Sequence, residues 1–188
     1  MVRKAVKKFS ETSSETASEL LNSAFHEVRL FSVILLVHQY QHGDAAKQSE
    51  IYKCYRQNID QVNNWDIVDA SAPYLTGHYF YGRSRKPLYQ LLKSRNLWRR
   101  RIAVMSTFYF IHQGDYGDTL SMAEQLLDAP EDLMHKATGW MLREVGNRDR
   151  ACEQEFLDRY ADSMARIMLR YAIEKFSQSE RAHYLSKA

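Results

Sequence analysis

The sequence predicts an all-α fold, an α-α superhelix in which pairs of helices repeat along the chain and leave one concave groove. Only 7 glycines and 3 prolines interrupt 188 residues, and no stretch alternates polar and apolar residues as a strand would. Arg29, Trp65, Arg101 and Ala137 are each 36 residues apart, and Arg170 follows Ala137 after 33. A period of this size, with two helices per unit, is typical of HEAT-like and related helical repeats.

The candidate helices follow one another with short breaks whose residue types suit helix ends. Asn64 is a suitable N-cap for a helix that begins at Trp65, and Gly146 suits the position just after another helix. Glycine, aspartate or proline marks the breaks near positions 43, 114 and 129. The predicted helices cover residues 14–23, 26–41, 45–58, 64–81, 87–93, 97–112, 118–127, 131–145, 150–160, 161–176 and 179–186.

The composition is that of one folded domain. The chain has 188 residues, of which 45% are hydrophobic and 26% charged. Its longest apolar run, residues 31–37, is much shorter than the ~20 residues that cross a membrane. Cys54 and Cys152 lack disulfide-type or metal-type spacing, which favours a reducing cytoplasm. No histidine or carboxylate pattern suits a metal site, and we expect neither a metal nor another cofactor.

The charges are modest in sum but locally clustered. The net charge is only +3 at pH 7, yet Arg83, Arg85 and Lys86 form one basic cluster and residues 99–101 form a second. Local basic ridges suit binding to the backbone of a nucleic acid. Taken alone, each cluster fits a solvated helix surface equally well.

Two predicted helices place a tryptophan beside charged groups on one face. Trp65 and Asp69 are i and i+4, so their side chains lie one above the other. Lys136, Trp140 and Arg143 share a face in the same way. The cations suit an anionic ligand, and the carboxylate and the aromatic surface suit a part of that ligand that becomes cationic. The face of the second helix that we expect to be buried carries Thr138, Leu142 and Val145.

Each of these residues also has an ordinary structural explanation. Tryptophans in helices mostly belong to the core. An aspartate in the first turns of a helix is usually a cap or a partner of the helix dipole. Arginines in repeat proteins often join neighbouring repeats. The functional interpretation therefore depends on the combination of residues rather than on any one of them.

Four ordered segments carry a resemblance to a known family: residues 63–69, 94–104, 135–146 and 168–176. Together they resemble the AlkD-type DNA alkylation repair glycosylases, which are built from HEAT-like repeats, over about residues 2–184. The resemblance implies that residues 1–188 form a single glycosylase domain of this type without the family's first helices. Ala165 and Ile167 depart from the family pattern at the start of a helix.

The resemblance also implies a set of site residues. Trp65, Asp69 and Trp140 correspond to the catalytic cleft of the family, and Arg101 corresponds to an arginine that contacts DNA. Further cations expected at the DNA-binding groove are Arg100, Lys136, Arg143 and Arg170.

The implied activity is the excision of cationic N3- and N7-alkylated purines from double-stranded DNA by hydrolysis of the N-glycosidic bond. An alkylated purine is already a good leaving group, so the enzyme mainly has to stabilise an oxocarbenium-like deoxyribose. Asp69 would supply negative charge, and the indole faces of Trp65 and Trp140 would hold the sugar. Most glycosylases extrude the base into a closed pocket, whereas the resemblance implies a cleft without one.

The family further implies a monomer in a bacterial-type cytoplasm, associated with the nucleoid through DNA. Two alternatives belong to other functional classes. A non-catalytic HEAT-repeat protein would bind damaged or branched DNA, and a protein-interaction scaffold would have a more apolar groove. A DNA affinity that falls steeply with salt would separate a DNA-binding groove from a scaffold.

Overall fold

The structure, a computed structural model, describes residues 2–187, and these contain helices but no strand, which confirms the predicted all-α fold. The elements in chain order are α1 (Val2–Lys8), α2 (Ser14–Glu19), η1 (Leu20–Asn22), α3 (His26–His42), α4 (Ala45–Gln57), η2 (Ile59–Gln61), α5 (Trp65–Ala72), η3 (Pro73–Gly77), α6 (His78–Phe80), α7 (Lys86–Leu92), α8 (Leu97–His112), α9 (Gly117–Glu124), α10 (Asp132–Gly146), α11 (Arg150–Tyr160), α12 (Arg166–Ala172), η4 (Ile173–Lys175) and α13 (Gln178–Leu185).

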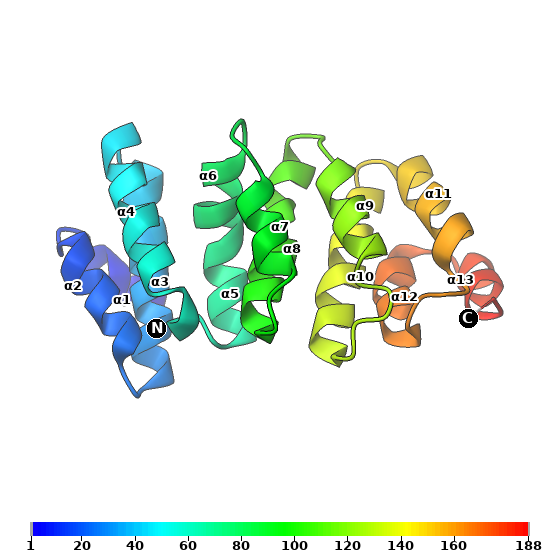
Figure 1. The fold of residues 1–188 in the computed structure, drawn as a ribbon, viewed down its shortest axis with the longest axis horizontal. Helices are drawn as coiled ribbons and strands as arrows, with labels where there is room; N and C mark the ends of the chain where they lie inside the picture. The colour runs from blue at the N-terminus through cyan, green and yellow to red at the C-terminus, as the bar shows by residue number, and fades with distance from the viewer. Residues whose placement is uncertain (1, 188) are drawn as a thin grey trace.

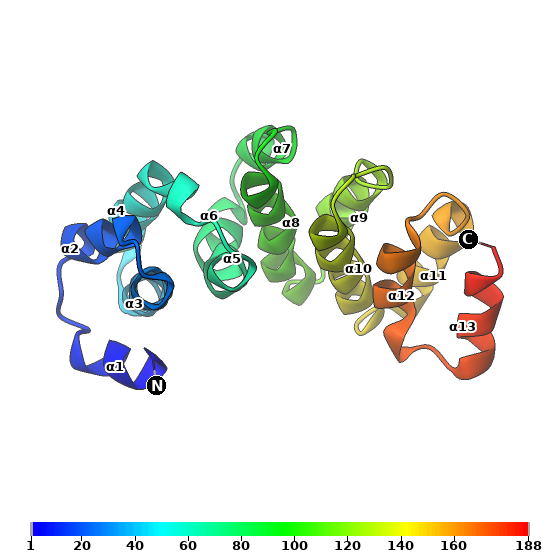
Figure 2. The same ribbon diagram turned by 90° about the horizontal axis from the view of Figure 1, so that it is seen from below.

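The helices stand side by side along the length of the molecule (Figure 1), and the view turned by 90° shows that they form two layers that curve into an arc (Figure 2). Helices α3, α5, α8, α10 and α12 contact one another in that order and form the inner layer. Helices α2, α4, α7, α9 and α11 form the outer layer, and Figure 2 shows the inner helices on the concave side of the arc. The arrangement is the α-α superhelix that the sequence predicts.

A continuous apolar core fills the space between the two layers. Inner helices contribute fully buried residues such as Leu36 of α3 and Ile102 of α8. In α10, the residues predicted to face inward, Thr138, Leu142 and Val145, are all buried. Because each repeat packs only on its neighbours, this core fixes the order and spacing of the inner helices along the arc.

The repeat length is 36 residues only in part of the chain. The outer helices α2 and α4 are joined at this spacing, for example where Ser14 Oγ donates to Glu50 Oε1 at 2.5 Å. Successive inner helices, however, begin 39, 32, 35 and 34 residues apart. The predicted 36-residue series therefore does not mark equivalent positions. Its members lie in inner helices as expected, but Trp65 is the first residue of α5 and Arg101 the fifth of α8.

The segment predicted as one helix over residues 64–81 is continuous but contains a wider turn. Helix α5 passes directly into the π-helical turn η3, which leads into α6. Pro73 opens this turn and has no N–H to donate to a helical hydrogen bond. Gly77 lies so close to α8 that an added Cβ would collide with the carbonyl oxygen of Ser106. A Cβ added to Gly139 of α10 would likewise collide with the carbonyl oxygen of Met168 on α12. Wider turns of this type often occur at functional sites.

Three predicted helix boundaries are wrong. Helix α9 ends at Glu124, three residues before the predicted end at residue 127. The helix expected over residues 161–176 begins only at Arg166, because the residues before it form turns and Ala165 has an extended ψ of 134°. Gly146 does not follow its helix but is the last residue of α10, and Asn147 caps the end. A Cβ on Gly146 would collide with the side chain of Glu153. This glycine therefore makes room for Glu153 rather than stopping the helix.

Candidate active site

One part of the candidate site lies at the beginning of α5. Asn64 caps this helix as predicted, because its Oδ1 accepts from the Trp65 N–H at 2.7 Å. Oδ2 of the next residue, Asp66, lies 2.8 Å from Nε2 of His26 on α3, which joins the beginnings of two inner helices. The Trp65 side chain itself stays 55% exposed. Its indole is therefore a surface group and not part of the core.

Asp69, one turn after Trp65, is bound by Arg101 of α8. Nε and Nη2 of Arg101 donate to the two carboxylate oxygens at 3.0 and 2.8 Å, and Nη1 donates to the Leu133 carbonyl oxygen of α10 at 2.7 Å. The side chain of Arg101 is only 6% exposed, and that of Asp69 is 15% exposed. One arginine thus joins three consecutive inner helices and fixes both oxygens of Asp69.

Burial and charge act in opposite directions on Asp69. Loss of water raises the pKa of its carboxyl group above the ordinary value, while the hydrogen bonds and the charge of Arg101 lower it, and the net direction is upward. Little water screens the field of a carboxylate in such a place, so it interacts strongly with a cation that forms nearby. Electrostatically, Asp69 is suited to stabilise positive charge on a bound ligand.

Asp69, Arg101, Lys136 and Arg170 are each the fifth residue of their helix, namely α5, α8, α10 and α12. These predicted site residues therefore form one row across the inner layer. Exposure increases from Arg101, which is buried, to Lys136, which is half-buried, and then to Arg170, which is exposed. Within residues 2–187, the side chains of Lys136 and Arg170 have no ion pair or hydrogen bond. These two cations are free to bind an anion.

The other predicted groove cations, Arg100 and Arg143, are already paired with carboxylates. Arg100 binds Glu131, and Arg143 binds Glu174. Both arginine side chains are largely covered, with exposed fractions of 16% and 17%. A phosphate would have to displace a carboxylate to reach either of them.

Trp140 is held by a ring of contacts that the sequence analysis did not identify. Its Nε1 donates to Glu144 Oε1 at 3.1 Å, and Arg148 Nη1 donates to the other oxygen of Glu144 at 2.9 Å. Arg148 Nη2 lies 2.8 Å from Nε2 of His112 on α8. The centroid of the His112 ring lies 4.3 Å from that of Phe108. The Phe108 centroid lies 6.2 Å from that of Trp140, so the series of contacts begins and ends at this tryptophan. The i, i+4 spacing of residues 140, 144 and 148 was the available signal.

The protonation states of Glu144 and His112 favour their contacts with Arg148. Burial alone would raise the pKa of Glu144, but hydrogen bonds from Arg148 and Trp140 outweigh it and leave the pKa below its usual value. Burial and the charge of Arg148 lower the pKa of His112. A neutral imidazole can accept a hydrogen bond from Arg148, so both neighbours of this arginine are acceptors.

A cavity of about 350 Å³ lies beside Asp69, between α1, α3 and α5. Its apolar walls are formed by Val6, Ile34, Val37 and Ala70. Its polar lining residues, apart from Asp69, are Lys7, His38, Gln41 and Tyr74. In the part of the chain that the structure describes, none of these four side chains has a hydrogen bond or an ion pair. Sequence reasoning did not find this cavity, because it depends on how three separate helices converge.

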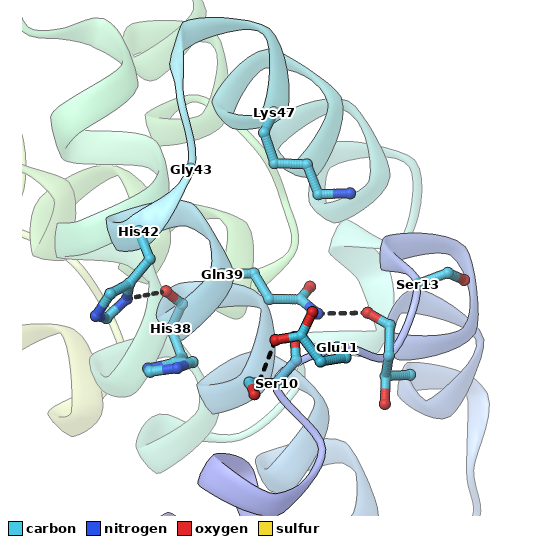
Figure 3. Close-up of a pocket in the computed structure, with 9 residues that line it drawn as sticks. Ser10, Glu11, Ser13, His38, Gln39, His42, Gly43 and Lys47 are labelled. Carbon is cyan, nitrogen blue, oxygen red and sulfur yellow. Dashed lines mark hydrogen bonds between the residues drawn. The ribbon is translucent and has the colours of Figure 1, made fainter.

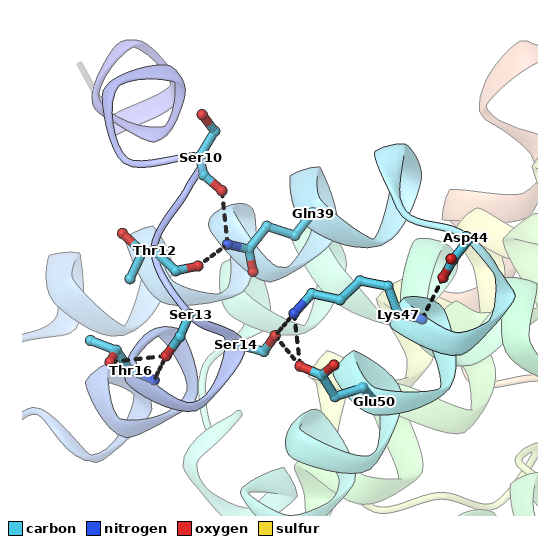
Figure 4. A network of polar contacts seen from close by, with 9 residues as sticks. All are labelled: Ser10, Thr12, Ser13, Ser14, Thr16, Gln39, Asp44, Lys47 and Glu50. Atoms are coloured by element: carbon cyan, nitrogen blue, oxygen red, sulfur yellow. Dashed lines mark hydrogen bonds and ion pairs between the residues drawn. The ribbon is translucent and has the colours of Figure 1, made fainter.

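A second cavity, of about 460 Å³, lies where the α1–α2 connection meets the end of α3 and the start of α4 (Figure 3). Its polar groups are mostly bonded to protein atoms. Nε2 of Gln39 donates to the carbonyl oxygens of Ser10 and Thr12, and Lys47 donates to Glu50 at 2.8 Å (Figure 4). This cavity is therefore a junction between the first two repeats and not a reactive site.

No helix among residues 2–187 is long and apolar enough to cross a membrane. In the same residues, no group of three or more His, Cys, Asp or Glu side chains is arranged to hold a metal ion.

Comparison with known proteins shows which family the sequence matches and which solved structure shares its fold. The sequence pattern of the family described as "DNA alkylation repair enzyme" matches residues 1–176. A solved structure, described as a predicted DNA alkylation repair enzyme from Enterococcus faecalis, superposes with a TM-score of 0.69 and is 15% identical in sequence. The superposition covers 94% of this chain and 83% of the Enterococcus faecalis chain. That likeness shows a shared fold. Comparison with curated proteins gave no significant match. Because the family pattern spans nearly the whole sequence, this chain belongs to the DNA alkylation repair enzyme family.

Proposed function

We propose that this protein is a DNA glycosylase that excises cationic N3- and N7-alkylated purines from double-stranded DNA. Membership of the family indicates a role in DNA repair. The observation that supports the glycosylase reaction is the state of Asp69. Its carboxylate is largely buried, bound at both oxygens by Arg101 and placed one turn from the exposed indole of Trp65. This combination suits a site where a cationic sugar forms.

In the proposed reaction, the N-glycosidic bond between C1′ of the deoxyribose and N9 of the alkylated purine breaks. Its electron pair goes to the purine, which leaves as a neutral base. The deoxyribose gains oxocarbenium character, and water then adds to C1′ and releases a proton. The carboxylate of Asp69 stabilises the positive charge on the sugar. Because a cationic purine needs no acid to leave, the site requires no second carboxyl group. A neutral damaged base such as uracil should be a poor substrate.

Arg101 has a positioning role in this proposal instead of a direct contact with DNA. Its donors are bonded to Asp69 and to the carbonyl oxygen of Leu133. A carboxylate that is fixed in advance needs no reorganisation when charge develops on the sugar. The arginine thus contributes to the reaction through the position of Asp69.

The tryptophans complete the proposed sugar-binding surface. Trp65 and Trp140 lie on α5 and α10, the two inner helices that pack on either side of α8. An electron-rich indole face attracts a sugar that carries positive charge. The exposed Trp65 can make this contact directly, while Trp140 is oriented by Glu144.

The free cations of the inner row supply the grip on DNA. Lys136 and Arg170 have no partner in the described residues and can bind phosphates. Contacts of this kind fix the duplex without reading its sequence. One concave groove is enough for one duplex, so we propose that the protein acts as a monomer. The cavity beside Asp69 is lined partly by the exposed residues Lys7 and Gln41 and is therefore open to solvent, which fits a site that does not enclose the base.

The test is the release of 7-methylguanine and 3-methyladenine from methylated duplex DNA, measured by chromatography for the wild type and for Asp69→Asn. The expected result is release by the wild type and a loss of ~100-fold or more in the variant, because one stabilising charge is removed from the transition state. Uracil-containing DNA should give no release.

Asp118→Asn is the matched control. Asp118 is bound by Arg85, and its side chain is 14% exposed, close to the 15% of Asp69. This variant should lose a similar ion pair and keep its excision activity. Equal activity of Asp69→Asn and the wild type would contradict the assignment of Asp69. No release by the wild type, together with salt-sensitive DNA binding, would favour a non-catalytic DNA-binding protein.

A further inference from the structure

We infer that a small cavity between α3, the η3–α6 segment and α8 binds a phosphodiester group of the DNA backbone through uncharged hydrogen-bond donors. The inference rests on the proposed binding of double-stranded DNA and adds to it a phosphate contact that involves no cation. It assigns roles to Tyr74, His78 and Tyr109, which the proposed sugar chemistry does not use.

The cavity lies beside the candidate active site. Its lining residues are Tyr40, Gln41, Gln48, Tyr74, His78 and Tyr109. Gln41 and Tyr74 are exposed and also line the cavity beside Asp69, so the two cavities adjoin. His78 follows Asp69 by nine residues, which is about 13.5 Å along the helix axis at 1.5 Å per residue. A duplex held at Asp69 extends over this distance, because its major groove alone is about 12 Å wide.

The size of the cavity suits a backbone group and not a base. Its volume is about 160 Å³. This is the space of about five water molecules at ~30 Å³ each, and it is smaller than the roughly 300–1,000 Å³ of sites for small organic molecules. A tetrahedral phosphate group fits such a space, whereas a purine nucleoside does not. The damaged base therefore stays outside this cavity.

The hydroxyl group of Tyr40 determines which nitrogen of His78 carries the hydrogen. Tyr40 Oη lies 2.8 Å from Nδ1 of His78, and Tyr40 is buried. Because this phenol has no other hydrogen-bond partner among the described residues, its O–H donates to Nδ1. A neutral imidazole whose Nδ1 accepts a hydrogen bond has its hydrogen on Nε2. That N–H has no partner within residues 2–187 and is available to a ligand.

Three more uncharged donors line the cavity. In the part of the chain that the structure describes, the hydroxyl groups of Tyr74 and Tyr109 and the amide of Gln41 have no hydrogen bond. Side chains of these types commonly donate to phosphate oxygens in protein–DNA complexes. Gln48 of α4 is different, since its Nε2 donates to the carbonyl oxygens of Tyr40 and Gly43. The available donors thus belong to the inner layer.

Gly77 allows the walls of the cavity to come together. An added Cβ on Gly77 would lie 2.9 Å from the Cβ of Tyr109, which is too close for any other residue. With glycine at this position, the rings of Tyr109 and His78 pack edge to face with centroids 5.1 Å apart. The Tyr40 ring contacts the same imidazole edge to face at 5.3 Å. Two tyrosines therefore fix the orientation of His78 before a ligand binds.

The charge near the cavity favours an anion. Burial raises the pKa of Tyr40 to about 12, against the lowering effect of the Arg83 charge. Burial and the same charge lower the pKa of His78, so both groups are uncharged at neutral pH. The lining residues include no carboxylate. A ligand in the cavity therefore meets a positive field from Arg83 and a set of neutral donors.

The experiment combines substitutions in the cavity with the removal of single charges from the DNA. In each duplex one phosphodiester is replaced by an uncharged methylphosphonate, at every position in turn on both strands. The double variant Tyr74→Phe/Tyr109→Phe loses two hydroxyl groups and keeps both rings. The control is Tyr81→Phe, because Tyr81 is 38% exposed and lies outside the lining of the cavity. Fluorescence anisotropy at pH 8, where an imidazole is uncharged, gives the affinities.

The double variant is expected to bind the unmodified duplex about tenfold more weakly than the wild type and Tyr81→Phe, because it loses two hydrogen bonds to a charged group. At one methylphosphonate position this difference should disappear. The slope of log affinity against log salt concentration should not change, since no cation is removed, whereas Lys136→Ala should reduce it by about 1. His78→Phe should behave as the double variant does. A double variant with the affinity of the wild type, or with a deficit that persists at every position, would overturn the inference.

Release of alkylated base separates this inference from the proposed function. If one position abolishes the difference but the wild type releases no base, the phosphate site stands and the glycosylase assignment fails. If the wild type releases base but no position abolishes the difference, the glycosylase stands and the inference is overturned. Calorimetric binding of tetramethylammonium to the free protein, together with a scan that shows no such position, would identify an aromatic site for cations and would likewise overturn the inference.

Discussion

Arg101 and Asp69 lie 32 residues apart in the sequence and bind each other through two hydrogen bonds of 3.0 and 2.8 Å. A second pair with the same geometry starts from the same helix, because Arg99 donates to both oxygens of Asp60 at 2.7 Å. The side chains of the second pair are 38% and 59% exposed, against 6% and 15% for the first. Helix α8 thus contains an exposed counterpart for its buried ion pair.

Arg101→Lys is expected to lower the free energy of unfolding by about 2 kcal/mol or more, because a lysine cannot occupy both carboxylate oxygens and leaves buried polar atoms without partners. Arg99→Lys should change it by less than about 1 kcal/mol, since exposed pairs contribute little. Urea denaturation measures both values. Excision should fall by ~10-fold or more in Arg101→Lys and stay unchanged in Arg99→Lys. Equal effects of the two substitutions would show that Arg101 does not position Asp69.

Glu144→Ala is expected to reduce excision by ~10-fold, because the indole of Trp140 loses the acceptor that orients it. Glu144→Gln should retain most of the activity, since an amide oxygen can still accept from Nε1 of Trp140. Single-turnover rates at saturating enzyme separate this orienting effect from weaker binding. Glu124→Ala, on the outer helix α9, is the control. A full rate in Glu144→Ala would mean that the orientation of Trp140 does not matter.

Lys136→Ala and Arg170→Ala should each weaken binding to duplex DNA and reduce the slope of log affinity against log salt concentration by about 1, because each removes one phosphate contact. The effect should be the same for different DNA sequences. Arg159→Ala, on the outer helix α11, should change neither quantity. Fluorescence anisotropy at several salt concentrations provides the measurement, and an unchanged slope in both groove variants would exclude these residues from the DNA interface.

Glu153 should make the protein less stable at alkaline pH. Glu153 is 1% exposed, and its Oε1 has no hydrogen-bond partner among the described residues. Burial raises the pKa of its carboxyl group to about 8, against the lowering effect of the charges of Arg150 and Arg143. Folding therefore favours the protonated form. The stabilisation is complete below the unfolded pKa near 4.5 and is lost as the pH rises through about 8. Glu153→Gln keeps the uncharged state at every pH.

Thermal melting of this variant and the wild type at pH 5 and pH 9 tests the effect. The two proteins should melt at similar temperatures at pH 5, and the variant should melt higher at pH 9. A variant that melts lower than the wild type by the same amount at both values would show that Glu153 is not protonated in the folded protein.

The fold could be predicted from the sequence because its signals are local. Short breaks between long apolar-periodic segments indicated successive helices, and Asn64 marked the start of α5 correctly. Trp65 and Asp69 were placed correctly relative to each other because both lie in α5, about one turn apart. Relationships within one helix do not depend on how the repeats are spaced.

The partners across helices could not be predicted in the same way. The sequence did not indicate that Arg101 binds Asp69, although both occupy the fifth position of adjacent inner helices. That correspondence depends on the unequal lengths of the repeats, which a uniform 36-residue period hides. The cavity beside Asp69 likewise requires the packing of α1 and α3 against α5.

Gly77 and Gly139 set how closely neighbouring inner segments approach each other. At Gly77 and Gly139, hydrogen atoms occupy the places where any other residue would press a methyl group against the next helix. A methyl group at either point would push adjacent repeats apart, and the resulting rotation would displace the chain ends in proportion to their distance from it. The spacing between Lys136 and the far end of the arc therefore depends on contacts that involve none of the charged residues.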